Sequence, residues 1–261
     1  MKNMKKVYAI LLGLGLTVAA SAQGFGSRMA DLDLDREIGD SPFSYEVLSY
    51  IHFGFNGLLN PDAEVSKAKT FVRSQEFGFN VAELAFAPYS GGRISVGADV
   101  AWKWFRLTGG YYWWPHNVNV PHMQVENARL VRIGSVATDG YYVKEVKRST
   151  LTVCTFRFPL DFAHQIGKVT LNVGAAFEIN LNACSRFRGV GMDGSTIKDT
   201  SSGLRYSKNI TTYRYSYNVH ASVSYGGLGI YGRYSPVPVL GEGFGPQFST
   251  WTAGLVVGLG M

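Results

Sequence analysis

Hydrophobic and polar residues alternate along most of the chain, and this period of two is typical of β-strands with one apolar and one polar face. Residues 212–225 show it most clearly, with tyrosine, valine and alanine at odd positions and arginine, serine, asparagine and histidine at most even ones. The alternation slips between Val81 and Leu84, which predicts a β-bulge. In all, the pattern predicts eight strands: Ser44–Leu59, Ser74–Phe86, Arg93–Trp104, Thr150–His164, Val169–Ala183, Thr212–Tyr225, Leu228–Ser235 and Gln247–Met261.

The connections between these strands alternate in length. Short turns fall at 90–92, 167–168 and 226–227, and long polar segments fall at 60–73, 115–149, 188–209 and 238–246. Short turns at one end and long loops at the other are typical of a transmembrane β-barrel. We therefore expect an all-β, eight-stranded antiparallel up-and-down transmembrane barrel with both chain ends on the short-turn side, and a ten-stranded barrel is the alternative.

The longest loop contains a second pattern of its own. Asp139-Gly140 is a favoured hairpin turn, and it separates two alternating segments, Ala128–Val136 and Tyr141–Arg148. These segments carry Arg132, Lys144, Glu145, Lys147 and Arg148. We expect them to form a hairpin above the membrane rather than within it.

Alternation alone does not decide which face of the strands points outward, because a soluble lipocalin-like barrel would turn its apolar face inward. The polar face here is mostly Gly, Ser, Thr and Asn with isolated charges, and the apolar face is crowded with aromatic residues suited to interfacial belts. An outward Lys or Arg would cost about 2–4 kcal/mol at the middle of a bilayer. We therefore expect the polar face to line a filled interior.

Composition agrees with this assignment. Charged residues make up 17% of the chain, below the roughly 25% of soluble domains, and aromatic residues make up 14%. Lys2, Lys5 and Lys6 precede an apolar stretch and an Ala20-Ser21-Ala22 cleavage site, so we expect residues 1–22 to be a signal peptide. Its removal takes the formal charge from +6 to +3, and no nucleic-acid partner is expected. Residues 23–43 form an acidic periplasmic lead-in, and 44–261 form the barrel domain.

The charged residues of the polar face predict a network inside the barrel. A turn at Gly167-Lys168 places Arg157 opposite Glu178, and a turn at Gly226-Gly227 places His220 opposite Arg233. We expect Arg157 to meet the Glu178 carboxylate with two hydrogen bonds. The full interior set is Glu46, His52, Asp99, Lys103, Arg157, Asp161, Glu178, Arg214, His220 and Arg233.

The two cysteines, Cys154 and Cys184, lie at opposite parities of adjacent predicted strands. One is therefore expected to face lipid and the other the interior, and two free thiols are predicted, because a disulfide needs converging Cβ vectors.

Outside the barrel wall, Arg186, Arg188, Lys198, Arg205 and Lys208 gather around the third long loop. They could contact lipopolysaccharide phosphates in the outer leaflet, although a plain solvated loop explains them equally well. A G-x-G-x-x-G match at 227–232 spans a hairpin turn rather than a helix N-terminus, so it predicts no nucleotide site. No catalytic residue, cofactor or metal is expected.

Two short motifs carry a resemblance to a known family. The first is Phe156–Phe162 followed by Gly167 and Val169–Ala176, and the second is Tyr234-Ser235-Pro236 followed by Gly245-Pro246. Together they resemble the PorT-like outer-membrane β-barrel family over about 44–261. The resemblance implies the Gram-negative cell envelope, a shared fold and varied roles, some of them linked to protein secretion, and it carries over no catalytic residues.

These observations predict an outer-membrane protein that anchors, binds at the surface or assists a secretion complex. The alternative is an outer-membrane enzyme that acts on lipid or peptide at the outer rim. A narrow pore is disfavoured, because side chains fill an eight-stranded interior.

Overall fold

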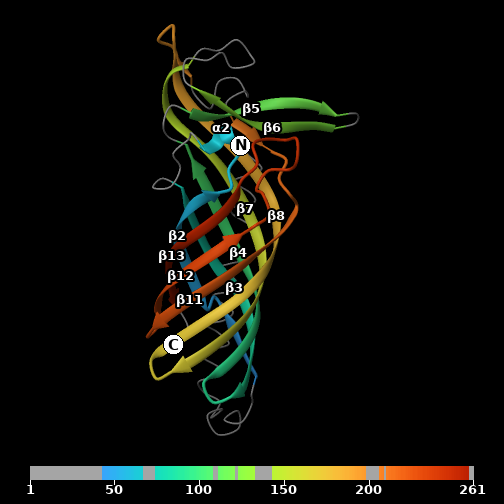
Figure 1. Ribbon diagram of the computed structural model, residues 1–261. Coiled ribbons are helices and arrows are strands. Elements are labelled where there is room, and N and C mark those ends of the chain that lie inside the picture. Colours follow the sequence, from blue (N-terminus) through green and yellow to red (C-terminus); the bar gives the residue numbers. More distant parts are fainter. Residues whose placement is uncertain are drawn as a thin grey trace.

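The computed structural model describes residues 43–66, 74–107, 111–120, 123–132, 143–197, 206–208 and 210–258 (Figure 1). Eight antiparallel strands form a closed ring, in which each strand pairs with two neighbours and β13 pairs back to β2. The strands of the ring are β2 (Tyr50–Leu59), β3 (Gln75–Tyr89), β4 (Gly92–Arg106), β7 (Val143–Ile166), β8 (Val169–Gly191), β11 (Tyr215–Tyr225), β12 (Leu228–Ser235) and β13 (Ser249–Gly258). The predicted eight-stranded all-β barrel is confirmed.

The two ends of the barrel differ as expected. Two-residue turns join β3 to β4, β7 to β8 and β11 to β12 at one end, which we call the short-turn end. The first described strand, β1 (Phe43–Val47), begins at this end, because Phe43 pairs with Phe86 near the β3–β4 turn. β13 also finishes there, where the backbone N–H of Gly258 donates to the carbonyl of Gly227. The opposite end is the loop end.

The predicted hairpin of Ala128–Val136 with Tyr141–Arg148 is wrong over its described part. β5 (Tyr111–Val120) instead pairs with β6 (Met123–Arg132) as a separate two-stranded sheet at the loop end, and Val143 already belongs to β7 (Figure 1). β7 and β8 run on together beyond the ring as far as Val143 opposite Gly191. Residues 143–148, which were expected to form the second strand of the hairpin, therefore pair with β8 instead. Residues 133–142, including the Asp-Gly pair, lie outside the described residues.

Short elements complete the loop end. β9 (Thr196–Ile197) and β10 (Tyr206–Lys208) both pair with β8, and α2 (Ala63–Ser66) is a single helical turn after β2. No helix among the described residues is both long and apolar enough to cross a membrane.

The first predicted strand is present but bent. Leu48 adopts a positive φ of 54°, and the register against β3 shifts there, from Val47 opposite Ala82 to Ile51 opposite Phe79. On β3, Val81 is left out of the register with β4 between Asn80 and Ala82, which confirms the predicted bulge. β3 pairs with both β1 and β2 along one edge and with β4 along the other.

β2 and β13 close the ring along a seam rich in glycine. Gly54 lies directly opposite Gly254, and a Cβ added at Gly254 would come within 2.1 Å of the Phe53 carbonyl oxygen. A Cβ at Gly57 would strike the Trp251 ring at 2.2 Å. The seam therefore brings the two backbones closer than any larger residue would allow.

The polar face of the strands points into the barrel, and the apolar face points out. His52 and Asn56 on β2 are 3% and 0% exposed, whereas Phe53 and Phe55 between them are 41% and 40% exposed. The interior is not uniform along the axis. At the loop end a buried apolar cluster fills it, comprising Phe105, Leu107, Trp113, Leu151, Val153, Ala183, Ile210, Val239, Leu240 and Phe248.

Candidate functional site

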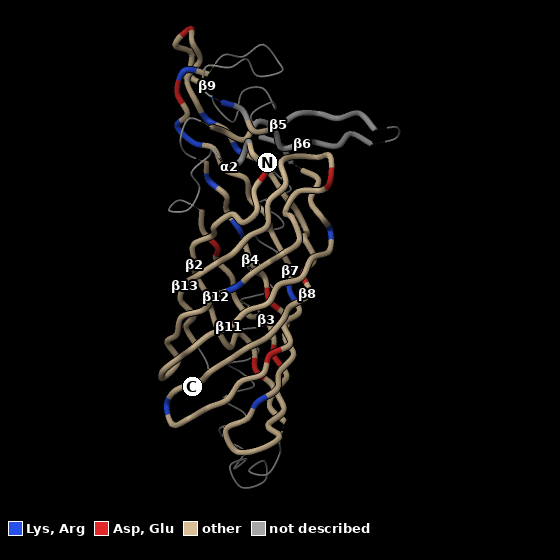
Figure 2. The backbone as a smooth tube through the Cα atoms, in the orientation of Figure 1, with Lys and Arg blue, Asp and Glu red and all other residues tan. Residues whose placement is uncertain are grey.

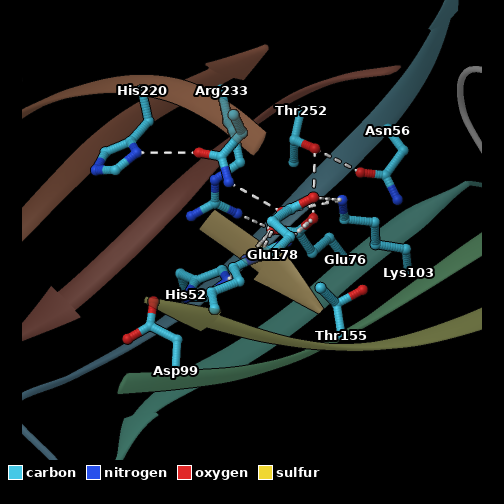
Figure 3. Close-up of polar contacts among 12 residues, drawn as sticks. His52, Asn56, Glu76, Asp99, Lys103, Thr155, Glu178, His220, Arg233 and Thr252 are labelled. Atoms are coloured by element: carbon cyan, nitrogen blue, oxygen red, sulfur yellow. Dashed lines mark hydrogen bonds and ion pairs between the residues drawn. The ribbon is translucent and has the colours of Figure 1, made fainter. Parts of the chain in front are cut away.

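An ionic layer, formed by Glu76, Lys103, Arg157, Glu178 and Arg233, lies inside the barrel on the short-turn side of the apolar cluster. Figure 2 marks the charged positions along the backbone, and Figure 3 shows polar contacts of this layer. Its predicted centre is confirmed, because Arg157 on β7 lies opposite Glu178 on β8 and its Nε donates to Glu178 Oε1 at 2.9 Å. Arg157 and Glu178 are 0% and 1% exposed. The bidentate contact, however, is made elsewhere. The Nη1 and Nη2 groups of Arg157 donate to Glu76 on β3, at 3.2 and 2.8 Å.

Glu76 is the central residue that the sequence reasoning missed. It is fully buried, and besides Arg157 it contacts Arg233 Nη1 and His52 Nε2, the latter at 3.2 Å. A signal was present, since Glu76 lies at an even position with Gly78 and Asn80, before the parity slip. One carboxylate thus joins strands β2, β3, β7 and β12 across the interior (Figure 3).

Glu178 is the second carboxylate of the layer, and it accepts hydrogen bonds from several side chains. Lys103 Nζ lies 3.3 Å from both of its carboxylate oxygens, which places this predicted residue in the network. Ser216 Oγ and Asn218 Nδ2 on β11 also donate to Glu178, each at 2.9 Å. Three cationic side chains therefore meet two carboxylates, and all five are almost wholly buried.

A second pair lies on the short-turn side of this layer. His220 Nε2 is 2.6 Å from Asp161 Oδ1, and His220 Nδ1 is 3.1 Å from Asn218 Oδ1. His220 faces Arg233 in the register, as predicted. Gly174 makes room for the pair, because a Cβ there would lie 2.1 Å from Asp161 Oδ1 and 2.8 Å from His220 Nε2.

Asp99 is the most isolated of the interior carboxylates. It is 1% exposed and accepts hydrogen bonds from Tyr50 Oη at 2.8 Å and Asn80 Nδ2 at 3.1 Å. No Lys or Arg nitrogen of the described residues lies within ion-pair distance of it. Neutral donors alone therefore satisfy this buried carboxylate.

The remaining predicted interior residues lie near the openings of the barrel. Glu46 reaches Arg93 Nη2 at 3.4 Å, and Glu83 reaches the same nitrogen at 2.9 Å, in a partly exposed trio near the short-turn end. Arg214 is a correction. It is exposed in a bend just before β11, with its guanidinium 5.7 Å from the Tyr215 ring centroid, because the strand begins three residues later than expected.

The expectation of a wholly filled interior is wrong for the short-turn half. A cavity of about 1310 Å³ extends from the rim turns at Gly91, Gly167 and Gly226 to Asp161. A smaller cavity of about 80 Å³ continues from it to the ionic layer. Small inward residues leave this space, among them Ser44, Ser49, Ala85, Ala87, Ser95, Ala163, Thr170, Ser222 and Ser224.

The cysteine prediction fails on orientation. In the register of β7 with β8, Cys154 lies opposite Asn182 and Thr152 lies opposite Cys184. Leu181, just before Asn182 in β8, has no partner on β7 and is therefore a bulged residue. This bulge reverses the parity of β8, so Ala183 is buried and Cys184 faces outward, as Cys154 does. Both thiols are free in the structure.

The predicted outer-leaflet residues lie at the loop end where they are described. Arg186 and Arg188 are on the outward face of β8, and Arg188 lies directly opposite Arg148 of β7. Lys208 in β10 faces Cys184 in the register. Lys198 and Arg205 lie outside the described residues.

Chemically, the interior offers carboxylates, guanidinium groups and imidazoles that mostly bind one another. No group of three or more His, Cys, Asp or Glu side chains in the described part of the chain is arranged to hold a metal ion. Comparison with models of known families finds no match for this chain, and comparison with curated proteins finds none either.

Proposed function

We propose that the protein is an integral outer-membrane β-barrel of a Gram-negative envelope that acts as an anchor and surface-binding scaffold rather than as an enzyme. The observation that carries the proposal is the inverted wall. Large apolar side chains are exposed around the outside, such as Leu160 at 56%, Val173 at 56% and Ile230 at 63%, while charges are buried inside. Water-soluble proteins rarely expose so large an apolar surface, whereas a bilayer would cover it.

The height of the apolar wall supports the same proposal. Along β11 the outward residues begin with Tyr215 and Tyr217, continue through Val219 and Val223, and end with Tyr225. A transmembrane strand needs about 9–11 residues, and aromatic side chains are enriched at both interfaces of a bilayer. The eleven residues of β11 match that span, with an aromatic group at each end.

The interior supports a scaffold over a pore. A solute that entered from the short-turn end would meet first the ionic layer around Arg157 and then the apolar cluster around Phe248. The described barrel is therefore blocked at two successive levels. Among the described residues, the cavity of the interior lies in the short-turn half. This arrangement stiffens the wall and presents the loops at the far end.

The partners that fit are outer-membrane lipid, lipopolysaccharide and an envelope or secretion-complex protein. The extension of β7 and β8 beyond the ring carries Lys144, Lys147, Arg148, Arg186 and Arg188. Arginine side chains bind phosphate with paired hydrogen bonds, and the inner charges of lipopolysaccharide are phosphates. Membership of the PorT-like family would fit this set of features and stays part of the proposal.

The enzymatic alternative finds less support in the geometry. A hydrolase would need an imidazole nitrogen free to accept a proton from a nucleophile. Both ring nitrogens of His220 already face Asp161 and Asn218. His52 has Nε2 against Glu76 and Nδ1 without a hydrogen-bond partner among the described residues, but at 3% exposure it is closed off from a lipid or peptide at the outer rim. These positions favour a structural role for both histidines. Lipid hydrolysis by the purified protein would contradict that role.

Fractionation and gel mobility test the proposal. Full-length protein should sediment with outer membranes, and the folded protein should migrate differently on SDS gels before and after boiling, because a closed barrel resists SDS. The boiled sample of the same preparation is the control. Recovery in the soluble periplasm, without any heat-dependent shift, would refute the proposal.

A further inference from the structure

Cys154 on β7 and Cys184 on β8 lie on the same outward face of two adjacent strands. Cys154 lies opposite Asn182 and Cys184 lies opposite Thr152, so the two cysteines are diagonal neighbours across the β7–β8 ladder. Both are partly exposed free thiols, and they lie close enough together to interact electrostatically. The bulge at Leu181 creates this arrangement, because a regular β8 would turn Cys184 toward the interior.

The pair lies near the loop end of the wall, beyond the apolar span of the neighbouring strand. Ile179 on β8 lies opposite Tyr215, the outward aromatic residue at which β11 begins. Cys184 lies five residues further toward the loop end, and Asn182 between them is exposed on the outward face. An exposed amide favours the interface over the hydrocarbon layer of a bilayer. The two thiols are therefore placed where a water-soluble reagent can reach them.

The spacing of the pair suits a bond between the two sulfur atoms. Diagonal neighbours in a regular antiparallel sheet lie about 7–8 Å apart, and a disulfide needs Cα atoms within about 7 Å, so a shift of about 1 Å closes it. Leu181 supplies the freedom for this shift, because the ladder is interrupted beside Cys154 and Leu181 has no partner on β7. In the described part of the chain, no third metal ligand joins the two thiols.

We propose that Cys154 and Cys184 are a redox-active pair, which closes a reversible disulfide between β7 and β8 when a small disulfide compound oxidises it. One cysteine attacks a sulfur of the external disulfide, and the other then displaces the mixed disulfide that results. One S–S bond breaks and one forms. The external disulfide takes up two electrons, and the two thiol protons leave with the two thiols that are released.

The bond would change the wall just below the β7–β8 extension. In the reduced protein the bulge leaves β8 free to move against β7, whereas the disulfide would hold the two strands together across it. Because the strands must shift to close the bond, the disulfide is strained, and strained disulfides are easily reduced. The loop end of the wall would therefore become more rigid in an oxidising medium and loosen again in a reducing one.

Thiol labelling of the folded full-length protein in detergent tests the pair. The protein is incubated with oxidised glutathione and then with N-ethylmaleimide, and its intact mass is measured. Without oxidation, both cysteines should take a maleimide. After oxidation neither should, no glutathione should stay attached, and the mass should be lower by two hydrogens. Excess reduced glutathione should then restore both labels.

Two variants separate ring closure from simple thiol reactivity. Cys154→Ser should hold one glutathione on Cys184, because the second thiol that would displace it is absent. Cys184→Ser combined with Arg186→Cys keeps two cysteines on the outward face but moves one of them two residues further along β8. This displaced pair is too far apart to close, so it should hold two glutathiones and form no internal bond.

The inference is overturned if wild type keeps both thiols free, if it holds two glutathiones as the displaced pair should, or if it forms disulfides only between chains. It is also overturned if the internal bond, once formed, resists excess reduced glutathione. The heat-dependent gel shift reports in each sample whether the barrel is folded, so failure here leaves the membrane proposal standing.

Discussion

At the scale of single residues, the Arg157–Glu178 contact is the clearest test of the ionic layer. Glu178→Ala should lower the free energy of unfolding by about 3–5 kcal/mol, because it leaves Arg157 and Lys103 short of a buried carboxylate. Arg157→Ala with Glu178→Ala should cost less than the two separate losses combined. Urea unfolding in lipid vesicles measures all three variants.

Glu145→Ala is the matched control for this series, because it removes an exposed carboxylate from the same strand as Arg157. It should stay within about 0.5 kcal/mol of wild type. Single variants of Arg157 and Glu178 that unfold like this control would contradict a structural role for the layer.

Gly174 makes a second residue-level prediction. Gly174→Ala should separate Asp161 from His220, since the added Cβ would occupy the space between them. We expect a loss of about 1–3 kcal/mol in unfolding free energy, typical of overpacking. Gly232→Ala is the control, because nothing lies within 4 Å of a Cβ at that position. Equal stability of the two variants would contradict the tight fit.

The sequence predicted part of this chemistry and missed part of it for a physical reason. The choice of Gly167-Lys168 as the turn placed Arg157 opposite Glu178, because a short turn determines the register of both strands. It could not show that Glu76, on a strand that pairs with neither β7 nor β8, crosses the interior to the same guanidinium. Contacts across a barrel depend on strand tilt and stagger, which pairing rules alone do not provide.

At the scale of elements, the β7–β8 extension is where surface binding should be measurable. Arg148 and Arg188 lie directly opposite each other, so this stretch of the extension concentrates positive charge at the loop end. Arg188→Ala should weaken binding to vesicles that contain lipopolysaccharide by about five-fold, since each basic residue near an anionic surface contributes roughly 1 kcal/mol.

The control for the extension is Lys168→Ala, a basic residue in a turn at the opposite end of the barrel. Sedimentation with vesicles compares the two variants at equal salt. Equal binding would mean that the extension is only a solvated loop.

Strands were predicted correctly where polar and apolar residues alternate over a long segment. The prediction failed where a segment had more than one possible pairing partner. All eight ring strands were identified, because each buries one polar face over eight or more residues. The hairpin expected between Ala128–Val136 and Tyr141–Arg148 is not formed by the described residues of these segments, because β6 pairs with β5 and β7 pairs with β8. The orientation of Cys184 was wrong because one bulged residue, Leu181, reverses every position after it.

At the scale of the whole molecule, the barrel should be closed to ions. Purified protein in planar bilayers should show no single-channel conductance, because the apolar cluster and the ionic layer block the interior in succession. Phe248→Ala should remain closed, since it thins the cluster and leaves the ionic layer intact. Discrete wild-type channels that survive repurification would contradict this arrangement.

The hollow half was beyond sequence reasoning, although every residue that forms it was visible. The polar parity looked uniform, yet its inward residues are small toward the short turns, as Ser222 and Ala163 are, and large toward the loops, as Phe105 and Leu151 are. The volume left open is the difference between the volume that the barrel wall encloses and the summed volume of the inward side chains. That difference appears only after the strands are assembled.

The glycine seam between β2 and β13 has a consequence for how the protein is made. Gly54 and Gly254 join the first full strand of the ring to the last, so closure is the most long-range step of the fold. Before β13 pairs, β2 and β12 are both unpaired edges, and exposed edges recruit other strands. Until β13 pairs with β2 and β12, the nascent chain is therefore not a barrel of slightly lower stability. It is an open sheet with two free edges, and the time it spends in that form determines how readily it aggregates.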